Sequence, residues 1–232
     1  TGQTTSNNHA PCRVLNAKQG LPFNPLDLDK TRSCAPSGWI EHCYEIAEIL
    51  GSIYPSFGEI QVGSIRNALI ECYNAAGFAS NHMQATAPRF SEFWLCLKAK
   101  ADKQKDIRRI VTRLSSVFEL NLFDEKCKNP FSFYELITQP TVLDLHQVSI
   151  EENQRVAASF FLQILYRQMF ARQCVERLQQ AIILDEAHRV AKLRFIPKMM
   201  QECRKYGILF VVSSQRVVDF DPGVLESAGN HL

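Results

Sequence analysis

The residues with the clearest chemical potential in this chain are two adjacent carboxylates, Asp185 and Glu186. They follow the apolar run 181–184, which is too short for a helix and is typical of a buried strand. Ligands bind beyond the carboxyl ends of strands in open parallel sheets, so this position favours chemistry. Asp185 would hold a Mg²⁺ ion through water, and Glu186 would orient or deprotonate the water that attacks a γ-phosphate. The alternative is an acidic helix N-terminus that only complements the helix dipole.

A second polar position is predicted beside these carboxylates. The run 208–213 is another short apolar strand, and Ser214 and Gln215 follow it. If the two strands are parallel, Gln215 lies next to Glu186, where its neutral amide could sense a γ-phosphate without competing for the metal. Otherwise Gln215 is an ordinary loop residue.

A cation is predicted between the two strands. The segment 195–206 is predicted to be a helix that Gly207 stops, with Arg204 near its C-terminus. This helix runs antiparallel to the strands, so Arg204 should lie far from Glu186 within one subunit. It could reach the nucleotide of a neighbouring subunit as an arginine finger, or act only as a cation at a helix C-terminus. His188 has no second ligand at metal-binding spacing, which favours a structural histidine.

The sharpest local charge excess lies in the segment 98–113, which carries seven basic and two acidic residues. Contact with a DNA backbone is one interpretation, and its candidate residues are Lys103, Lys105, Arg108 and Arg109. The other is the solvated face of an amphipathic helix. No aromatic residue interleaves the basic ones, which argues against stacking on single-stranded nucleic acid.

The elements that position these residues follow from hydrophobic periodicity. After Pro140, the run 141–145 is predicted to be a strand, and the capping box at 149–152 opens a helix that should reach about residue 179. The order strand, helix, strand, helix, strand implies right-handed crossovers and a parallel sheet, hence an α/β fold.

Earlier in the chain, apolar residues recur at spacings of three and four, which predicts a small α-helical unit. Its helices are expected over 40–50, 62–73, 92–101 and 102–118. The segment 23–28 contains Pro25 and is predicted to be a loop that leaves a strand.

Composition sets the remaining limits. The chain has 232 residues, 46% hydrophobic and 22% charged, which is enough for one large domain or two small ones. Its eight cysteines show no Cys-x-x-Cys pair, so we interpret them as reduced and mostly buried. No apolar run approaches a membrane span and the start does not resemble a signal peptide, so we expect a cytoplasmic protein with no membrane association. A net charge of +2 neither demands nor excludes nucleic acid.

One component of a nucleotide site is missing from the sequence. The chain contains no G-x-x-x-x-G-K-[ST] motif, the Walker A loop whose amides and lysine hold phosphates. Either that loop lies before Thr1 or this is not a complete ATPase. We therefore predict negligible ATPase activity for these residues alone.

The motifs together resemble the C-terminal part of HerA/FtsK-type ATPases, which are hexameric DNA translocases and helicases. The resemblance rests on the segments 182–189, 202–207, 211–215 and 224–231, with weaker support from 23–27 and 141–145. It implies a RecA-like core formed by 1–34 and 139–232, an α-helical insertion at 35–138, and ATP, Mg²⁺ and DNA as ligands. It places Asp185 and Glu186 at the Walker B positions, Gln215 at the sensor, and Arg204 at nucleotide, between subunits of a homo-hexamer. A narrower resemblance is to the helicase domain of DptH proteins, from DNA phosphorothioation-dependent restriction systems.

Two other functions remain open at this point. The letters Asp-Glu-Ala-His also occur as motif II of superfamily 2 helicases, but those normally continue with a Ser-Ala-Thr-like motif and a second RecA domain. This chain has Ser-Ser-Gln instead. A non-catalytic DNA-binding or assembly module, working through the basic helix, is the remaining alternative.

Overall fold

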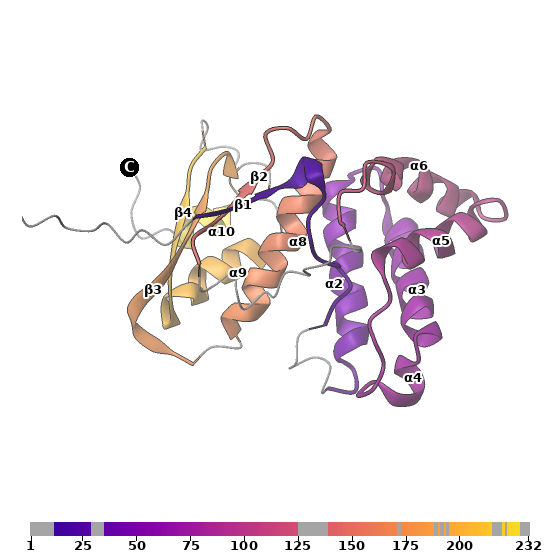
Figure 1. Ribbon diagram of the computed structural model, residues 1–232, viewed down its shortest axis with the longest axis horizontal. Coiled ribbons are helices and arrows are strands. Elements are labelled where there is room, and N and C mark those ends of the chain that lie inside the picture. Colours follow the sequence, from indigo (N-terminus) through magenta and orange to yellow (C-terminus); the bar gives the residue numbers. More distant parts are fainter. Residues whose placement is uncertain are drawn as a thin grey trace, which may run out of the picture.

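The structure is a computed structural model that describes residues 12–28, 35–124, 139–170, 173–187, 190, 193, 195–214, 220 and 222–227. Helices α2 to α6 gather at one end of the molecule and the strands lie toward the other, together with α9 and α10, with α8 between the two groups (Figure 1). The helices are α2 (Gly38–Ile53), α3 (Glu59–Ala75), α4 (Phe78–Asn81), α5 (Phe90–Ala101), α6 (Lys105–Glu119), α8 (Glu151–Phe170), α9 (Phe195–Glu202) and α10 (Pro222–Ser227), with 3₁₀ turns η1 (Ala17–Gln19) and η3 (Cys203–Lys205). The strands are β1 (Arg13–Asn16), β2 (Thr141–Asp144), β3 (Val175–Leu184) and β4 (Tyr206–Val212).

Helices α2 to α6 form the helical unit that the sequence predicts. Within it α2 packs on α3, α3 on α5, and α5 on α6. The apolar spacing explains this packing, since α6 buries Ile107, Ile110 and Leu114 on one face and exposes cations on the other. All four predicted helices are confirmed, with ends that differ by a few residues.

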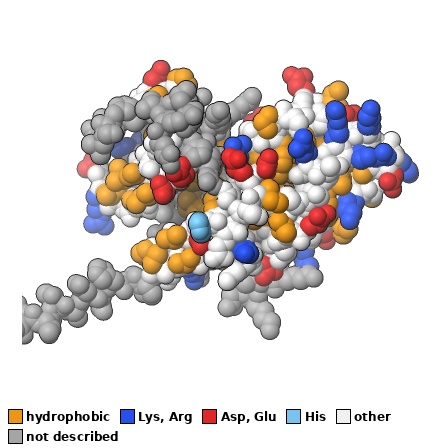
Figure 2. Space-filling model, turned by 90° about the horizontal axis from the view of Figure 1, so that it is seen from above, with side chains coloured by type: hydrophobic (Ala, Val, Ile, Leu, Met, Phe, Trp, Pro, Cys, Tyr) orange, Lys and Arg blue, Asp and Glu red, His pale blue; other side chains and the backbone are white. Residues whose placement is uncertain are grey.

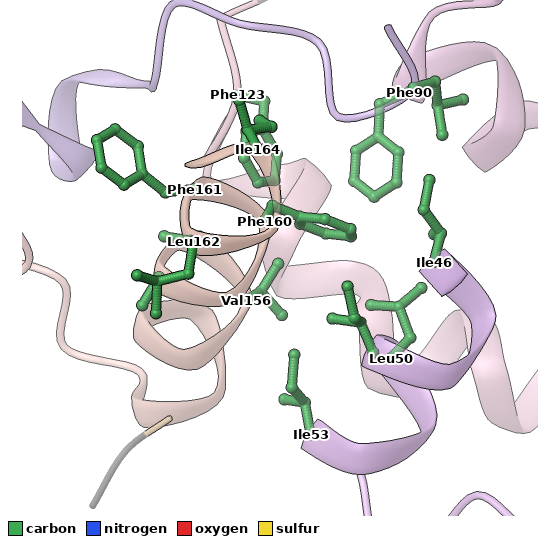
Figure 3. Close-up of a cluster of buried hydrophobic side chains, with 14 of the residues drawn as sticks. Ile46, Leu50, Ile53, Phe90, Phe123, Val156, Phe160, Phe161, Leu162 and Ile164 are labelled. Atoms are coloured by element: carbon green, nitrogen blue, oxygen red, sulfur yellow. The ribbon is translucent and has the colours of Figure 1, made fainter. Parts of the chain in front are cut away.

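The helical unit shares one hydrophobic core with α8. Phe160 of α8 is 1% exposed and meets the rings of Phe90 and Phe123 at centroid distances of 5.8 and 5.7 Å (Figure 3). Ile46 and Leu50 of α2 face the same cluster (Figure 3). The helical unit is therefore packed onto the rest of the chain and shares its core.

A buried polar network also joins α2 to α8. Arg167 donates to Glu45 Oε2 at 2.9 Å and to Nδ1 of His42, which is fully buried. The other ring nitrogen of His42 lies 3.2 Å from the carbonyl oxygen of Pro25. A carbonyl oxygen only accepts, so Nε2 carries the proton and the imidazole is neutral. The network ties the loop after β1, which was predicted correctly as a loop, to both helices.

The strands pair in parallel, as predicted, but in two separate pairs. β1 pairs with β2 over Arg13↔Thr141 to Asn16↔Asp144, and β3 pairs with β4. β2 has only four residues and ends where the Asp144 carboxylate accepts a hydrogen bond from the amide of His146 at 2.9 Å. This local turn stops the strand early.

The strand before the two carboxylates is longer than predicted, and the helix before it is shorter. α8 ends at Phe170, so the prediction of helix to about residue 179 is wrong from Val175 onward, where β3 begins. Val175 pairs with Tyr206 across an irregularity in the ladder. Gly207 makes this approach possible: its φ is +66°, and a Cβ there would lie 2.4 Å from the carbonyl oxygen of Arg177.

One face of the β3–β4 pair exposes large apolar side chains. Ile183 of β3 is 69% exposed, and its pairing partner Val211 and Leu209, two residues earlier on β4, are also exposed. Monomeric proteins rarely leave a contiguous apolar sheet face uncovered.

Among the described helices, none is both long and apolar enough to cross a membrane.

Candidate nucleotide site at the ends of β3 and β4

The ends of β3 and β4 are held in register beside each other. Leu184 pairs with Val212, and the amide of Ser213 donates to the carbonyl oxygen of Leu184 at 2.9 Å. One step further, the amide of Ala187 donates to the carbonyl oxygen of Ser213 at 2.8 Å. These bonds extend the ladder past both strands, so the residues after β3 and β4 form one joined edge.

Asp185 is fixed in place at this edge. Ser213 Oγ donates to Asp185 Oδ1 at 3.0 Å, and the amide of Glu186 donates to the same oxygen at 3.1 Å. Asp185 is exposed, so its carboxylate faces solvent while one of its oxygens is oriented by two donors. A carboxylate with this combination of exposure and fixed geometry suits an ion that also binds water and phosphate oxygens.

Glu186 has an unusual backbone conformation. Its φ is +53°, in the left-handed region, where a residue with a Cβ is disfavoured by about 1–2 kcal/mol. Its side chain is half-buried, and the next residue, Ala187, is 2% exposed and anchored to Ser213. Strained non-glycine residues of this kind cluster at functional sites, because the strain persists only where the surroundings impose it.

The structure brings together some predicted site residues and separates others. Asp185 and Glu186 lie beside Ser213, the residue that follows β4. Gln215 and His188 lie outside the described residues. Arg204 is exposed in η3, directly before β4 begins. The seven residues of β4 span about 23 Å of extended chain, so Arg204 lies at the opposite end of this strand from Ser213.

The predicted basic residues form a different feature, on the helical unit. Lys103, Lys105, Arg108 and Arg109 line one cavity of about 620 Å³ near the start of α6. Figure 1 places α6 at the far end of the molecule from β3 and β4. These cations therefore cannot act on a ligand bound at Asp185 in the same chain.

No cluster of three or more metal-binding side chains occurs in the described part of the chain.

The described cysteines are free thiols, and the pKa of Cys43 and of Cys72 is raised to about 12, mainly by burial. The interpretation of the cysteines as mostly buried holds for these two and for Cys203, whereas Cys96 is half-buried and Cys12 and Cys174 are exposed.

Comparisons with known proteins add information on the fold. No protein-family model matches the sequence, and no curated protein matches it significantly. Among solved structures, VirB4 of Thermoanaerobacter pseudethanolicus superposes with a TM-score of 0.67 at 18% identity, covering 93% of this chain and 60% of that one. The chain resembles VirB4 in fold. The bacterial conjugative coupling protein TrwBdeltaN70 also matches, at a TM-score of 0.49 and 14% identity, with 94% and 59% covered.

The likeness to VirB4 confirms the predicted α/β class of parallel strands and helices, which is a RecA-like arrangement. It extends over the helical unit as well as the strands, since it covers nearly the whole chain. The chain spans only about 60% of the VirB4 chain that it matches. At this identity the likeness concerns the fold alone, so the chemistry has to be argued from the residues themselves.

Ser213 is the site residue that sequence reasoning missed. The last apolar strand was expected to run through residue 213, which made the serine part of the strand and directed attention to Gln215. In the structure β4 ends at Val212, and the Ser213 hydroxyl holds Asp185. The sequence did carry a signal for it, because Ser213 follows its strand at the position where Asp185 follows the neighbouring strand.

Proposed function

We propose that this chain is the part of a DNA-translocating ATPase or helicase that carries the metal-binding and water-activating carboxylates. The hydrogen bond from Ser213 to Asp185 supports this most directly. It joins the carboxyl ends of two parallel strands, the location where α/β folds bind ligands, and it orients a carboxylate there. Glu186 then supplies the base or orienting group for the attacking water.

Mg²⁺ fits the donor set at this edge. Magnesium keeps several waters and takes one or two protein oxygens together with substrate phosphates, so a large cluster of side chains is not required. Asp185 offers an exposed carboxylate, and Ser213 orients one of its oxygens. When bound, the ion would neutralise charge on the phosphates of ATP.

The phosphate-binding loop has to come from outside these residues. The sequence contains no Walker A motif, and the apolar face around Ile183 and Leu209 lacks a covering layer in the described structure. We propose that the segment with this loop packs on that face. The 232 residues alone should then hydrolyse ATP negligibly.

Arg204 is proposed to act between subunits. Its place before β4 keeps it away from Asp185 of the same chain but leaves it exposed. An arginine finger contributed to the neighbouring protomer would require a closed ring, in keeping with the hexamer implied by the HerA/FtsK resemblance. A role in restriction or defence, including the DptH resemblance, rests on sequence motifs alone.

The test is Glu186→Gln in the full-length protein. The amide keeps the size of the side chain and loses its basicity, so DNA-stimulated ATP hydrolysis should fall at least about 100-fold while nucleotide binding is retained. Steady-state phosphate release and binding of a fluorescent ATP analogue measure the two quantities.

The matched control is Glu176→Gln, at the exposed far end of the same strand. It makes the same chemical change away from the proposed site and should leave turnover unchanged. Full turnover in Glu186→Gln would refute the proposal. Equal losses in both variants would point to a general effect on β3 and refute it as well.

A further inference from the structure

We propose that the cavity at the start of α6 is a binding site for the phosphodiester backbone of DNA. The proposal rests on the function above in taking DNA as the partner, but it concerns a separate surface. Five cations line this cavity against one acid, Asp102. The cations are Lys103, Lys105, Arg108, Arg109 and Arg113. Figure 2 shows Lys and Arg side chains gathered at the end of the molecule formed by the helical unit.

Most of the cations that line this cavity have no acidic partner among the described residues. Across the ranges that the structure describes, Lys103, Lys105 and Arg109 form no salt bridge. The nearby acid Asp106 instead accepts a hydrogen bond from Gln61 Nε2 at 2.8 Å. An ordinary solvated helix face intersperses charges of both signs, so this excess of one sign is a feature that an anion would balance.

The position of the cations on α6 strengthens the argument. The helix begins at Lys105, and its N-cap residue Gln104 makes no side-chain hydrogen bond to the first turn. The N-terminal amides therefore remain available, and the helix dipole is positive at this end. Cations there are unfavourable for the protein alone, whereas an anion would satisfy both the amides and the side chains.

Arg108 is already oriented for such a ligand. Its Nε donates to the carbonyl oxygen of Ala101 and its NH2 group to that of Asp102, each at 3.3 Å. These carbonyls belong to the C-terminal end of α5, whose dipole favours a cation. The guanidinium is thereby held at the cavity before any ligand arrives, which lowers the entropy cost of binding.

The extent of the site fits a polymer better than a single phosphate. Lys105 and Arg113 lie eight residues apart on α6, or about 12 Å along the axis. That length covers three to four phosphates of one DNA strand at about 3.4 Å each. Ser56 and Thr112 also line the cavity, although the Thr112 hydroxyl donates to the carbonyl oxygen of Arg108 at 2.9 Å. Among the described residues of the lining, Phe57 is the one aromatic residue, and it is 8% exposed. Hydroxyls with cations contact phosphates, and without exposed rings we expect little sequence preference.

The test uses the full-length protein without nucleotide and a fluorescent 30-base-pair duplex, with affinity measured by anisotropy over a range of salt concentrations. The variant carries Lys103→Gln, Lys105→Gln and Arg109→Gln, and leaves Arg108 in place because it is bonded to α5. The matched control carries Arg177→Gln, Lys198→Gln and Lys205→Gln, three exposed cations near the strands. Both variants lose the same net charge, and thermal melting checks that both fold.

The cavity variant should bind the duplex about tenfold more weakly or worse, and its log–log salt slope should fall by about 2.7. The control should lose much less, and duplexes of unrelated sequence should give the same result. Equal effects in the two variants would overturn the proposal, because net charge alone would then explain binding. Competition by polyglutamate or inorganic phosphate as strong as that by DNA, at equal charge, would also overturn it.

This outcome is separable from that of the ATPase proposal. Glu186→Gln should bind the duplex like the wild-type protein, because β3, which ends just before the two carboxylates, lies at the other end of the molecule from α6 (Figure 1). Loss of DNA binding in the cavity variant with an active Glu186→Gln would refute only the catalytic assignment. Normal DNA binding in the cavity variant with an inactive Glu186→Gln would refute only the cavity.

Discussion

The helical unit with α8 and the β3–β4 pair differ in how well they are covered. In the first, Phe90, Phe93 and Phe160 are at most 2% exposed and pack ring against ring. In the second, Ile182 is the only residue of β3 that is fully buried, and its neighbour Ile183 is 69% exposed. Burial of apolar surface is the main source of folding stability, so the helical unit with α8 should contribute most of the free energy of unfolding.

The residues that stabilise the fold and the carboxylates of the candidate site therefore lie in different parts of the molecule. The carboxylates stand at the end of the thinly covered strand pair, while the tightly packed helices carry the basic cavity. Elements with few buried apolar contacts belong to the less stable part of a protein, from which moving and ligand-binding parts are drawn. We therefore expect the strand pair to gain order when a further layer and nucleotide bind.

The largest effect is expected from Phe160→Ala in the shared core. Removing this ring should cost about 3–5 kcal/mol of unfolding free energy, because a cavity remains beside Phe90 and Phe123. Ile183→Ala on the exposed face should cost less than about 0.5 kcal/mol. Urea unfolding measures the stability of both variants. If Phe160→Ala does not fold, the milder variant Phe160→Leu is measured in its place. A cost at Ile183 as large as at Phe160 would show that this face is covered in solution and would break the comparison.

A smaller effect is expected at the start of β4. Gly207→Ala should destabilise by about 3 kcal/mol, since its φ of +66° is disfavoured with a Cβ and the added atom meets the Arg177 carbonyl oxygen at 2.4 Å.

Gly77→Ala is the control for this prediction. Its φ is +93°, but a Cβ there meets nothing within 4 Å, so it should cost about 1–2 kcal/mol. Thermal melting compares the two variants, and hydrogen exchange of β4 amides shows where the loss occurs. Equal losses of stability in the two variants would mean that β3 shifts to make room for the added methyl group. The strand pair would then be more easily deformed than the comparison suggests.

The helices were predictable because their periodicity is local. In α6 the residues Ile107, Ile110, Leu114 and Val117 recur at helical spacing, and all are buried. The start of β3 was not predictable in this way. Its residues 175–180 are mostly polar and exposed, so they carry no period-two signal, and their strand state depends on pairing with Tyr206 and on the positive φ of Gly207.

The candidate site was predictable in its carboxylates but not in its hydrogen bonds. An acid after a short apolar run marks a strand end, and this places Asp185 and Glu186 from sequence alone. The partner of Asp185 depends on the register of β3 against β4, a tertiary property, so Ser213 could not be assigned. The backbone conformation of Glu186 likewise has no sequence signal, because glutamate is not a residue that favours positive φ.

The smallest effect sharpens the comparison at the candidate site itself. Glu186 has a φ of +53°, which glycine adopts at little cost. Glu186→Gly should therefore stabilise the fold by a net of about 0.5–1 kcal/mol, after subtracting the greater freedom of glycine in the unfolded chain. Glu186→Gln retains the Cβ and should leave stability nearly unchanged. Urea unfolding of the two variants isolates the backbone contribution, because both remove the same carboxylate.

A gain in stability that accompanies loss of ATP turnover in the full-length protein would identify the strain at Glu186 as a cost retained for function. It would also show that the edge of the strand pair is held below its attainable stability at a residue where chemistry is proposed. If Glu186→Gly is less stable than Glu186→Gln, the left-handed conformation costs glutamate less than the greater freedom of glycine in the unfolded chain costs, and it carries no strain that function requires. That result would leave the hydrogen bond from Ser213 to Asp185 as the only structural support for the site.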